Sequence, residues 1–97
     1  MDTTFADVPD ESRFELRSGE EMIGFIAYRL AGGVITMVHT EVDPAHSGQG
    51  HAATLARNAL DDARERGLQV RPQCPFVASY IDKHPQYAAL VTPGGTR

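Results

Sequence analysis

The chain has 97 residues, of which 41% are hydrophobic, so we expect one folded domain over residues 1–97 rather than a disordered chain. Nine basic against thirteen acidic side chains give a net charge of −4, and no basic stripe occurs, which disfavours a nucleic-acid partner. No apolar run approaches the roughly 20 residues that cross a bilayer, so no membrane partner is expected. The one cysteine, Cys74, cannot form an internal disulfide, and the acidic N-terminus is unlike a signal peptide; both features indicate a cytoplasmic protein.

The first half of the chain predicts an antiparallel meander. Residues 1–12 are polar and acidic, and we expect a loosely held leader there. Alternation and β-forming residues then predict three strands, at 13–17, 21–30 and 34–42. Ala31-Gly32-Gly33 joins the last two strands, because paired glycines permit the positive φ angles of a tight hairpin.

The strand at 34–42 is expected to alternate strictly between two faces. One face would carry Val34, Thr36, Val38, Thr40 and Val42, and the other Ile35, Met37, His39 and Glu41. Pro44 would end this strand, since proline brings no N–H to a ladder.

A strand–helix–strand unit follows the meander. Alanine and leucine recur at helical spacing over residues 51–66, and Gly67 is a natural residue to end that helix. Residues 68–72 predict a short strand that runs parallel to the strand at 34–42. The predicted fold class is therefore mixed α/β, of the α+β kind.

The C-terminal part predicts one more helix. Pro75 suits a first helical position, and the residue before Pro85 is pushed out of the helical region, so the helix should run from Pro75 to near His84. Its apolar face would carry Phe76, Val77, Tyr80 and Ile81. Residues 85–91 would add one more turn, and residues 92–97 would form a mobile tail.

The turn before the first helix, Ser47-Gly48-Gln49-Gly50-His51-Ala52, is a candidate phosphate site. Its glycines let the backbone bend sharply, and unpaired N–H groups at the helix start would point at a ligand in front of it. Hydrogen bonds and the helix dipole make such a terminus suitable for phosphate, although the pattern alone is more often only a tight turn. A dinucleotide fingerprint is excluded because no third glycine occurs before Gly67, and the lysine of a P-loop is absent.

A few other side chains could carry chemistry. Cys74 lies between a strand end and a helix start, where a thiol is more nucleophilic, or it is a buried cysteine that acts as a small hydrophobe. His39 and Glu41 could position or deprotonate a nucleophile, or form a satisfied polar patch. Tyr80 could donate a proton to a leaving group, or lie at the edge of the core. The histidines match no zinc spacing, so no metal is expected.

Three sequence blocks together resemble the GNAT N-acetyltransferase superfamily, and in particular its minimal branch, over residues 21–91. The blocks are His39-Thr40-Glu41-Val42, Gly48-Gln49-Gly50-His51-Ala52, and Cys74-Pro75-Phe76-Val77 with residues 80–87. The resemblance implies a GNAT-like fold, in which the three-strand meander is followed by the β-α-β unit and a C-terminal helix.

The resemblance also implies acetyl-CoA as co-substrate. The superfamily signature has Arg or Gln, two residues, Gly, one residue, then Gly or Ala, and Ser47, Gly50 and Ala52 stand at those places. Main-chain N–H groups over residues 48–53 would cradle the pyrophosphate, and the pantetheine arm would pair with the strand edge at residues 40–42. The implied cofactor-binding residues are Thr40, Val42, Ser47, Gly48, Gln49, Gly50, His51, Ala52 and Ala53.

The family mechanism implies roles for three of the candidate residues. In direct transfer, Glu41 stands close to the place of a glutamate base, and Tyr80 stands about where many members keep a tyrosine acid. The minimal branch draws attention to Cys74 instead, which suggests an acetyl-cysteine intermediate, and we take Cys74 as the main catalytic residue. The functional hypothesis is an acetyl-CoA-dependent N-acetyltransferase for an unidentified amine, either a small amine or a protein lysine. The alternative is a non-catalytic acyl-CoA-binding or protein-interaction module on the same scaffold.

Overall fold

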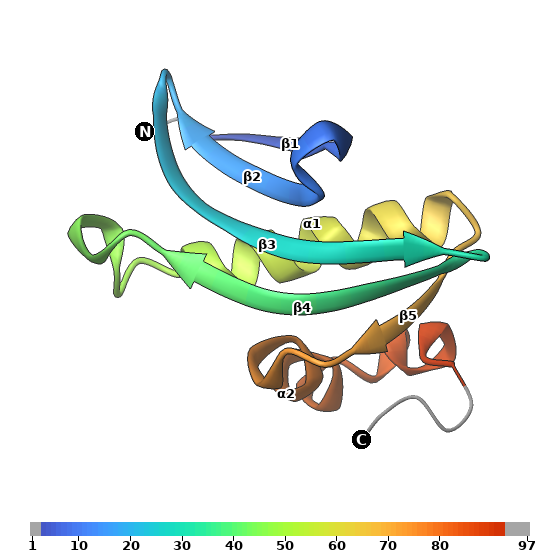
Figure 1. Cartoon of the computed structure of the whole chain (residues 1–97). Coiled ribbons are helices and arrows are strands. Elements are labelled where there is room, and N and C mark those ends of the chain that lie inside the picture. Colours follow the sequence, from blue (N-terminus) through green and yellow to red (C-terminus); the bar gives the residue numbers. More distant parts are fainter. Residues whose placement is uncertain (1–2, 93–97) are drawn as a thin grey trace.

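The computed structural model describes residues 3–92 and contains a five-stranded sheet in the order β1-β2-β3-β4-β5. The strands are β1 (Thr4–Val8), β2 (Arg13–Ser18), β3 (Glu21–Ala31), β4 (Val34–Val42) and β5 (Gln69–Pro72). The first four strands pair antiparallel in chain order, whereas β5 pairs parallel to β4 (Figure 1). The predicted α+β class is therefore confirmed, although the meander has four strands instead of three.

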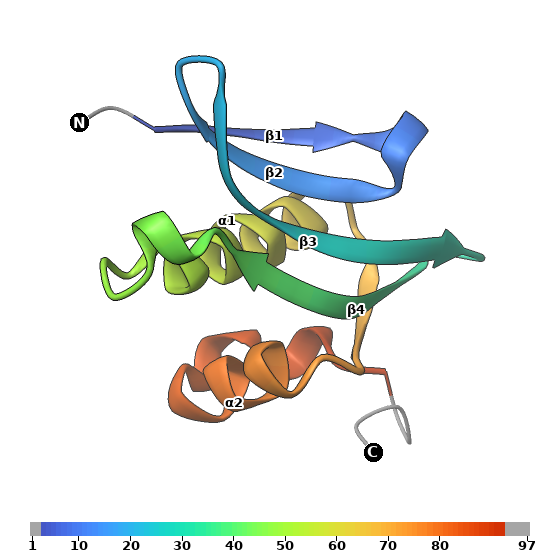
Figure 2. The ribbon, with the colours of Figure 1, turned by 60° about the vertical axis from the view of Figure 1, so that its left-hand side comes forward.

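Two α-helices and three 3-10 segments complete the described chain. The α-helices are α1 (His51–Glu65), which joins β4 to β5, and α2 (Pro75–Lys83). The 3-10 segments are η1 (Pro9–Glu11), η2 (Pro44–His46) and η3 (Pro85–Leu90). β1 and α2 lie at opposite ends of the molecule in both ribbon views (Figures 1 and 2). Within residues 3–92, neither α-helix is long and apolar enough to cross a membrane.

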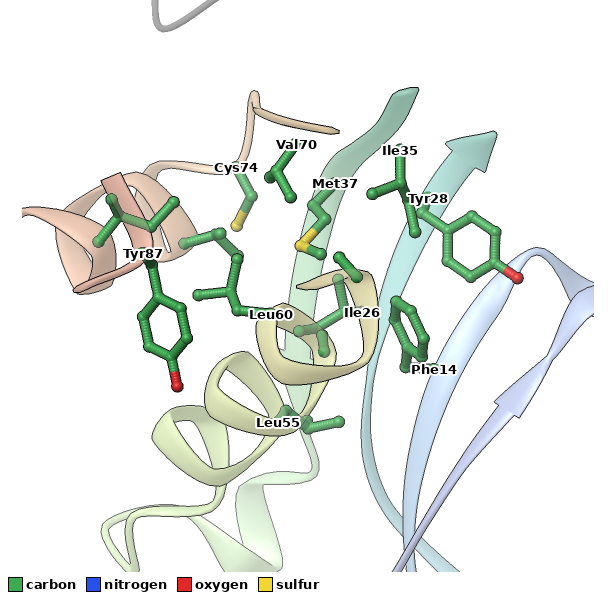
Figure 3. Close-up of a cluster of buried hydrophobic side chains, with 14 of the residues drawn as sticks. Phe14, Ile26, Tyr28, Ile35, Met37, Leu55, Leu60, Val70, Cys74 and Tyr87 are labelled. Atoms are coloured by element: carbon green, nitrogen blue, oxygen red, sulfur yellow. The ribbon is translucent and has the colours of Figure 1, made fainter. Parts of the chain in front are cut away.

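One face of the sheet packs against the helices and forms the core (Figure 3). α1 buries its apolar positions at the predicted helical spacing, and these are Leu55, Ala56, Ala59, Leu60 and Ala63. Val77 and Ile81 of α2 and Tyr87 of η3 join the same cluster. The strands contribute Phe14, Leu16, Ile23, Ile26, Tyr28, Ile35, Met37 and Val70. We call the side of the sheet that carries these residues the helix face, and the opposite side the outer face.

The N-terminal segment is more ordered than the sequence suggested. Residues 4–8, which we expected to belong to a loose leader, form β1 and pair in register with β2. Phe5 stacks on Phe14 with ring centroids 5.4 Å apart, and Asp7 accepts a hydrogen bond of 2.6 Å from the Tyr28 hydroxyl. A short, half-exposed strand of this kind shows little periodicity, because tertiary contacts rather than an apolar pattern hold it in place.

β4 contains a β-bulge that simple alternation did not predict. Tyr28 of β3 pairs with Met37, but the preceding β3 residue, Ala27, pairs with His39. Val38 is thus an extra residue in β4 with no partner of its own in β3.

The bulge changes which side chains of β4 share a face. Thr40 pairs with the core residue Ile26, so Thr40 lies on the helix face together with Met37. His39 and Glu41 lie on the outer face. The prediction that Met37, His39 and Glu41 share one face is therefore wrong, because the additional residue reverses the alternation beyond it.

The end of β5 leaves one edge of β4 open. The parallel pairing stops at Met37 and Pro72, although β4 continues to Val42. Beyond that pair, the Cys74 N–H donates to the Met37 carbonyl at 2.9 Å, and no described strand follows on that side. The last residues of β4 therefore present an unpaired edge of the kind that accepts an added extended segment.

The C-terminal end is anchored at the first residue of the predicted tail. The Thr92 N–H donates to the Val70 carbonyl at 3.0 Å, and Val91 forms an isolated parallel bridge with Val70. The remainder of the predicted tail, residues 93–97, lies outside the described residues.

Candidate functional site

The corner between β4 and α1 is built by local hydrogen bonds and two glycines. Asp43 accepts from the Ala45 N–H at 2.9 Å, and the Ser47 hydroxyl donates to the Pro44 carbonyl at 3.1 Å. Gly48 and Gly50 have φ angles of +78° and +79°, a region that side chains with a Cβ rarely adopt. The glycine turn predicted from the sequence therefore exists, and its backbone conformation requires glycine.

The amides at the start of α1 have no acceptor of their own. The first helical bond runs from the Thr54 N–H to the Gly50 carbonyl, at 3.1 Å. Within the described chain, no backbone or side-chain acceptor pairs with the N–H groups of residues 48–53. Gly50, at the N-cap, has no side chain that could satisfy them. A row of unpaired donors at the positive end of a 15-residue helix is suited to an anion.

These amides lie beside a hollow of about 300 Å³ between the corner and α2. Its lining comes from the end of β4, the glycine turn, the first turn of α1 and the first turn of α2, namely Val42, His46, Ser47, Gly48, Gly50, His51, Ala52, Ala53 and Phe76. Seven of the nine predicted cofactor-binding residues are thus brought together. The other two lie nearby in the chain: Gln49 contacts the His51 ring at 3.3 Å, and Thr40 lies further along β4.

Phe76 was missed as a site residue. The apolar pattern placed it on the buried face of α2 with Val77 and Ile81, but Phe76 is 39% exposed and lines the hollow. The prediction that Phe76 shares the buried face is wrong. The sequence did contain a sign of this. Phe76 comes one position before Val77, the first buried residue of α2, and such a residue lies at the edge of the buried helix face rather than within it.

Cys74 lies on the helix face, where α2 begins. Its side chain is 4% exposed, and Figure 3 shows the sulfur pointing into the apolar cluster. Thr40 Oγ1 lies 3.3 Å from the sulfur and is its polar neighbour. The bulge at Val38 makes this contact possible, because it turns Thr40 onto the helix face. The sequence placed Cys74 correctly between strand and helix, but it gave no sign of the threonine partner.

Glu41 and Cys74 lie on opposite faces of the sheet. The Glu41 carboxylate lies 3.0 Å from the His39 ring nitrogen Nε2, from which it accepts a hydrogen bond, and both side chains are well exposed on the outer face. His39 also packs near Phe25, with ring centroids 6.1 Å apart. The His39–Glu41 pair predicted from the sequence is therefore formed, but it faces solvent rather than the thiol.

Tyr80 lies on α2, one helical turn after Phe76. Its ring stacks on the His84 ring at 3.9 Å, and the His84 ring contacts the Tyr80 carbonyl at 2.8 Å. Tyr80 is half-buried at the border of the core. The stacking on His84 holds the Tyr80 ring on the same side of α2 as Phe76, one turn further along the helix.

Residues 3–92 contain no group of three or more histidine, cysteine or acidic side chains arranged to hold a metal ion.

Comparison with known proteins identifies the family. A family model described as GCN5-related N-acetyl-transferase matches residues 13–90, which include the glycine turn and both α-helices. The chain belongs to the GCN5-related N-acetyltransferase family. Protein NATD1 from Mus musculus and Protein NATD1 from Homo sapiens are each 34% identical to this GCN5-related chain over 62 residues, which is 62% of its length. The chain spans about half the length of these relatives, since the match covers 56% and 55% of them.

Two solved structures share the fold. The NMR structure of a GCN5-like protein from Staphylococcus aureus has a TM-score of 0.70 at 23% identity, covering 97% of this chain and 90% of that one. The crystal structure of a ribosomal-protein-alanine N-acetyltransferase from Brucella melitensis has a TM-score of 0.57 at 22% identity, covering 84% and 61%. At these identities the likeness concerns the fold, and it confirms the predicted GNAT-like architecture.

Proposed function

We propose that this chain is an acetyl-CoA-dependent N-acetyltransferase that acts on an amine acceptor still to be identified. The observation that carries the proposal is the row of unpaired amides over residues 48–53, which opens onto the hollow beside Phe76. Membership of the GCN5-related family supports the same reaction class.

The residues at the corner fit the diphosphate of acetyl-CoA. No lysine or arginine lines the hollow, so the backbone amides and the α1 dipole supply the attraction for the negative charge. The hollow also offers the apolar surfaces of Val42, Ala52, Ala53 and Phe76, which suit the methylene groups of a pantetheine arm.

The open edge of β4 gives the pantetheine arm a route toward the thiol. The amides of the pantetheine arm can pair with the unpaired main chain of β4 beyond Met37, as an added strand would. That route leads from Val42, at the hollow, to Thr40, which contacts Cys74. The acetyl thioester is thereby directed to the place where α2 begins.

In the proposed reaction Cys74 is the nucleophile. Its sulfur forms a bond to the acetyl carbonyl carbon while the bond from that carbon to the CoA sulfur breaks, and the proton lost by the Cys74 thiol goes to the departing CoA thiolate. The amine nitrogen then bonds to the same carbon, the acetyl-cysteine bond breaks, and the amine proton returns to the Cys74 sulfur. In the alternative route of direct transfer, without an acetyl-cysteine, Glu41 is proposed as the base for the amine and Tyr80 as the acid for the CoA thiolate. The position of Glu41 on the outer face favours the Cys74 route. A reducing, cytoplasmic compartment suits this role, because it keeps the free thiol of Cys74 intact.

A second candidate function is a non-catalytic acyl-CoA-binding or protein-interaction module on the same scaffold. The burial of Cys74 favours it, because a thiol that is 4% exposed among core side chains meets no substrate without local movement. Incubation with acetyl-CoA and a broad panel of amines and peptides separates the two functions. Release of CoA with acetylation of an amine supports the enzyme, whereas binding without transfer supports the module.

The diphosphate site is tested with a matched pair of glycine variants. Gly50→Val and Gly67→Val both place a β-branched residue at a left-handed backbone position with open space around it, at φ +79° and +70°, but at opposite ends of α1. We expect Gly50→Val to weaken acetyl-CoA binding about tenfold or more in isothermal titration, because the turn must change conformation. Gly67→Val should bind normally. Equal affinity of the wild type and Gly50→Val, or no binding at millimolar acetyl-CoA, would overturn the proposal.

A further inference from the structure

Three polar side chains lie in one row across the outer face of the sheet. Arg29 of β3 pairs with Thr36 of β4, and Thr36 pairs with Arg71 of β5. Their chain neighbours Tyr28, Met37 and Val70 point into the core, so the row points the other way. β3, β4 and β5 run side by side at this end of the molecule (Figure 1).

The row lines a hollow of about 350 Å³ on the outer face. Arg29, Ala31, Val34, Thr36, Arg71 and Gln73 surround it. Neighbouring strands are about 4.8 Å apart, so the two arginines start about 10 Å from each other across Thr36. Arginine side chains are long enough to converge from that distance on one small group held between them.

The two arginines have no acidic partner among residues 3–92. Arg13, Arg17, Arg64 and Arg66 each form an ion pair with a carboxylate at 3.1 Å or less, and neither Arg29 nor Arg71 does. Arg57 forms none among the described residues either, so what distinguishes Arg29 and Arg71 is that they line one hollow together. Two like charges beside one hollow repel each other unless an anion lies between them.

Thr36 places a hydroxyl between the two arginines. The residue is only 7% exposed, yet its hydroxyl forms no hydrogen bond with any other described residue and lines the hollow. A ligand oxygen between the arginines can accept a hydrogen bond from this hydroxyl, and the Gln73 amide offers a further donor.

We propose that Arg29, Thr36 and Arg71 bind an anionic group of the acceptor, a carboxylate or a phosphate. Guanidinium groups suit both, because their parallel N–H donors match two oxygens at once. Gln73, at the rim, directly precedes Cys74 in the chain, so the hollow on the outer face and the thiol on the helix face both lie near the end of β5. The proposal rests on the proposed function and narrows it, because the acceptor is then an amine that also carries a negative charge.

Binding of simple anions tests the site without any transfer reaction. Inorganic phosphate and succinate are titrated into the protein in saturating CoA, and the side-chain Nε–Hε signals of the arginines are followed by NMR. We expect saturable shifts at Arg29 and Arg71, and the preferred anion tells phosphate from carboxylate. Absence of saturable shifts with both anions would overturn the proposal. Saturating CoA occupies the α1 amides, so the added anions are free to bind only at the outer face. Failure of CoA to bind would count against the proposed function alone.

Variants that replace one arginine with the neutral glutamine show which arginines bind the anion. Arg29→Gln and Arg71→Gln should each weaken anion binding about tenfold and leave the affinity for acetyl-CoA unchanged. Arg57→Gln removes an exposed charge on α1 and serves as the matched control, with no expected effect. An equal loss in Arg57→Gln would show nonspecific attraction by net charge and would contradict the proposal.

Discussion

Cys74 combines two properties that seldom occur together. It is the N-cap residue of α2, where a thiol can be activated, and its side chain lies among core side chains with one polar contact, to Thr40. A residue with only a packing role needs no threonine hydroxyl at 3.3 Å, since a valine would fill the same space. The threonine contact therefore favours a chemical role for the thiol.

Replacement of Cys74 separates chemistry from packing. We expect Cys74→Ala to abolish acetyl transfer and leave acetyl-CoA affinity within about twofold, because the α1 amides are untouched. Loss of the buried sulfur should lower the free energy of unfolding by about 1 kcal/mol. Thr40→Val is the matched control, since it removes the polar contact and keeps the thiol. A fully active Cys74→Ala protein would refute the acetyl-cysteine route and leave Glu41 as the better choice.

The sequence predicted those parts of the site that depend on local structure. The glycine turn, the start of α1 and the position of Cys74 at the start of α2 each follow from a few adjacent residues. Phe76 and Thr40 were misplaced because their directions depend on other elements. Phe76 is exposed at the edge of the packing between α2 and the sheet, and Thr40 is turned by the bulge.

At the scale of whole elements, β4 shows why a register is difficult to predict. A β-bulge requires one strand to hold a residue that its partner lacks, and nothing in the alternation of residues 34–42 indicates it. β1 was missed for a related reason, since its stability comes from Phe14 and Tyr28 on other strands. The lengths of β4 and both α-helices were predicted within one residue, because periodicity and capping define them.

Gly24 is required where β3 passes closest to the end of β4. A Cβ added there would lie 2.6 Å from the Glu41 carbonyl oxygen and 3.2 Å from Leu55 of α1. We expect Gly24→Ala to lower the free energy of unfolding by about 2–4 kcal/mol in urea denaturation, because the backbone of β3 or β4 must move to make room for the Cβ. Gly19→Ala meets nothing within 4 Å and should cost only about 1 kcal/mol for its positive φ. Equal losses in the two variants would contradict this account of the close approach.

At the scale of the whole molecule, a polar network links the N-terminal strand to the helix. The Tyr28 hydroxyl donates to Asp7 of β1 at 2.6 Å, and Arg66 joins Asp7 to Asp62 of α1 at 3.1 and 2.8 Å. Burial raises the pKa of Tyr28 to about 12, and the hydrogen bond to Asp7 adds to the effect. Tyr87 is similar, since burial and its bond to Asp61 raise its pKa to about 12.

These two tyrosines predict how stability falls in alkali. The pKa of each tyrosine is raised above its ordinary value of 10.0. Between pH 10 and about 12, the folded state therefore keeps a proton that the unfolded state has lost. The stabilisation is complete below pH 10 and is lost as the pH rises to about 12. Tyr28→Phe should therefore be less stable than wild type at neutral pH, by about 1.5–3 kcal/mol, and should lose less stability above pH 10.

Urea unfolding at a series of pH values measures both effects in the Tyr28→Phe protein. Tyr87→Phe should behave in the same way, and the double variant should show the smallest decline in alkali, because the two hydroxyls bond to different carboxylates. Asp7→Asn keeps the Tyr28 hydroxyl but replaces its charged acceptor with a neutral one, so it should weaken the link between β1 and β3 at neutral pH. An alkaline decline in Tyr28→Phe as steep as that of wild type would mean that this hydroxyl does not hold β1 against the rest of the molecule.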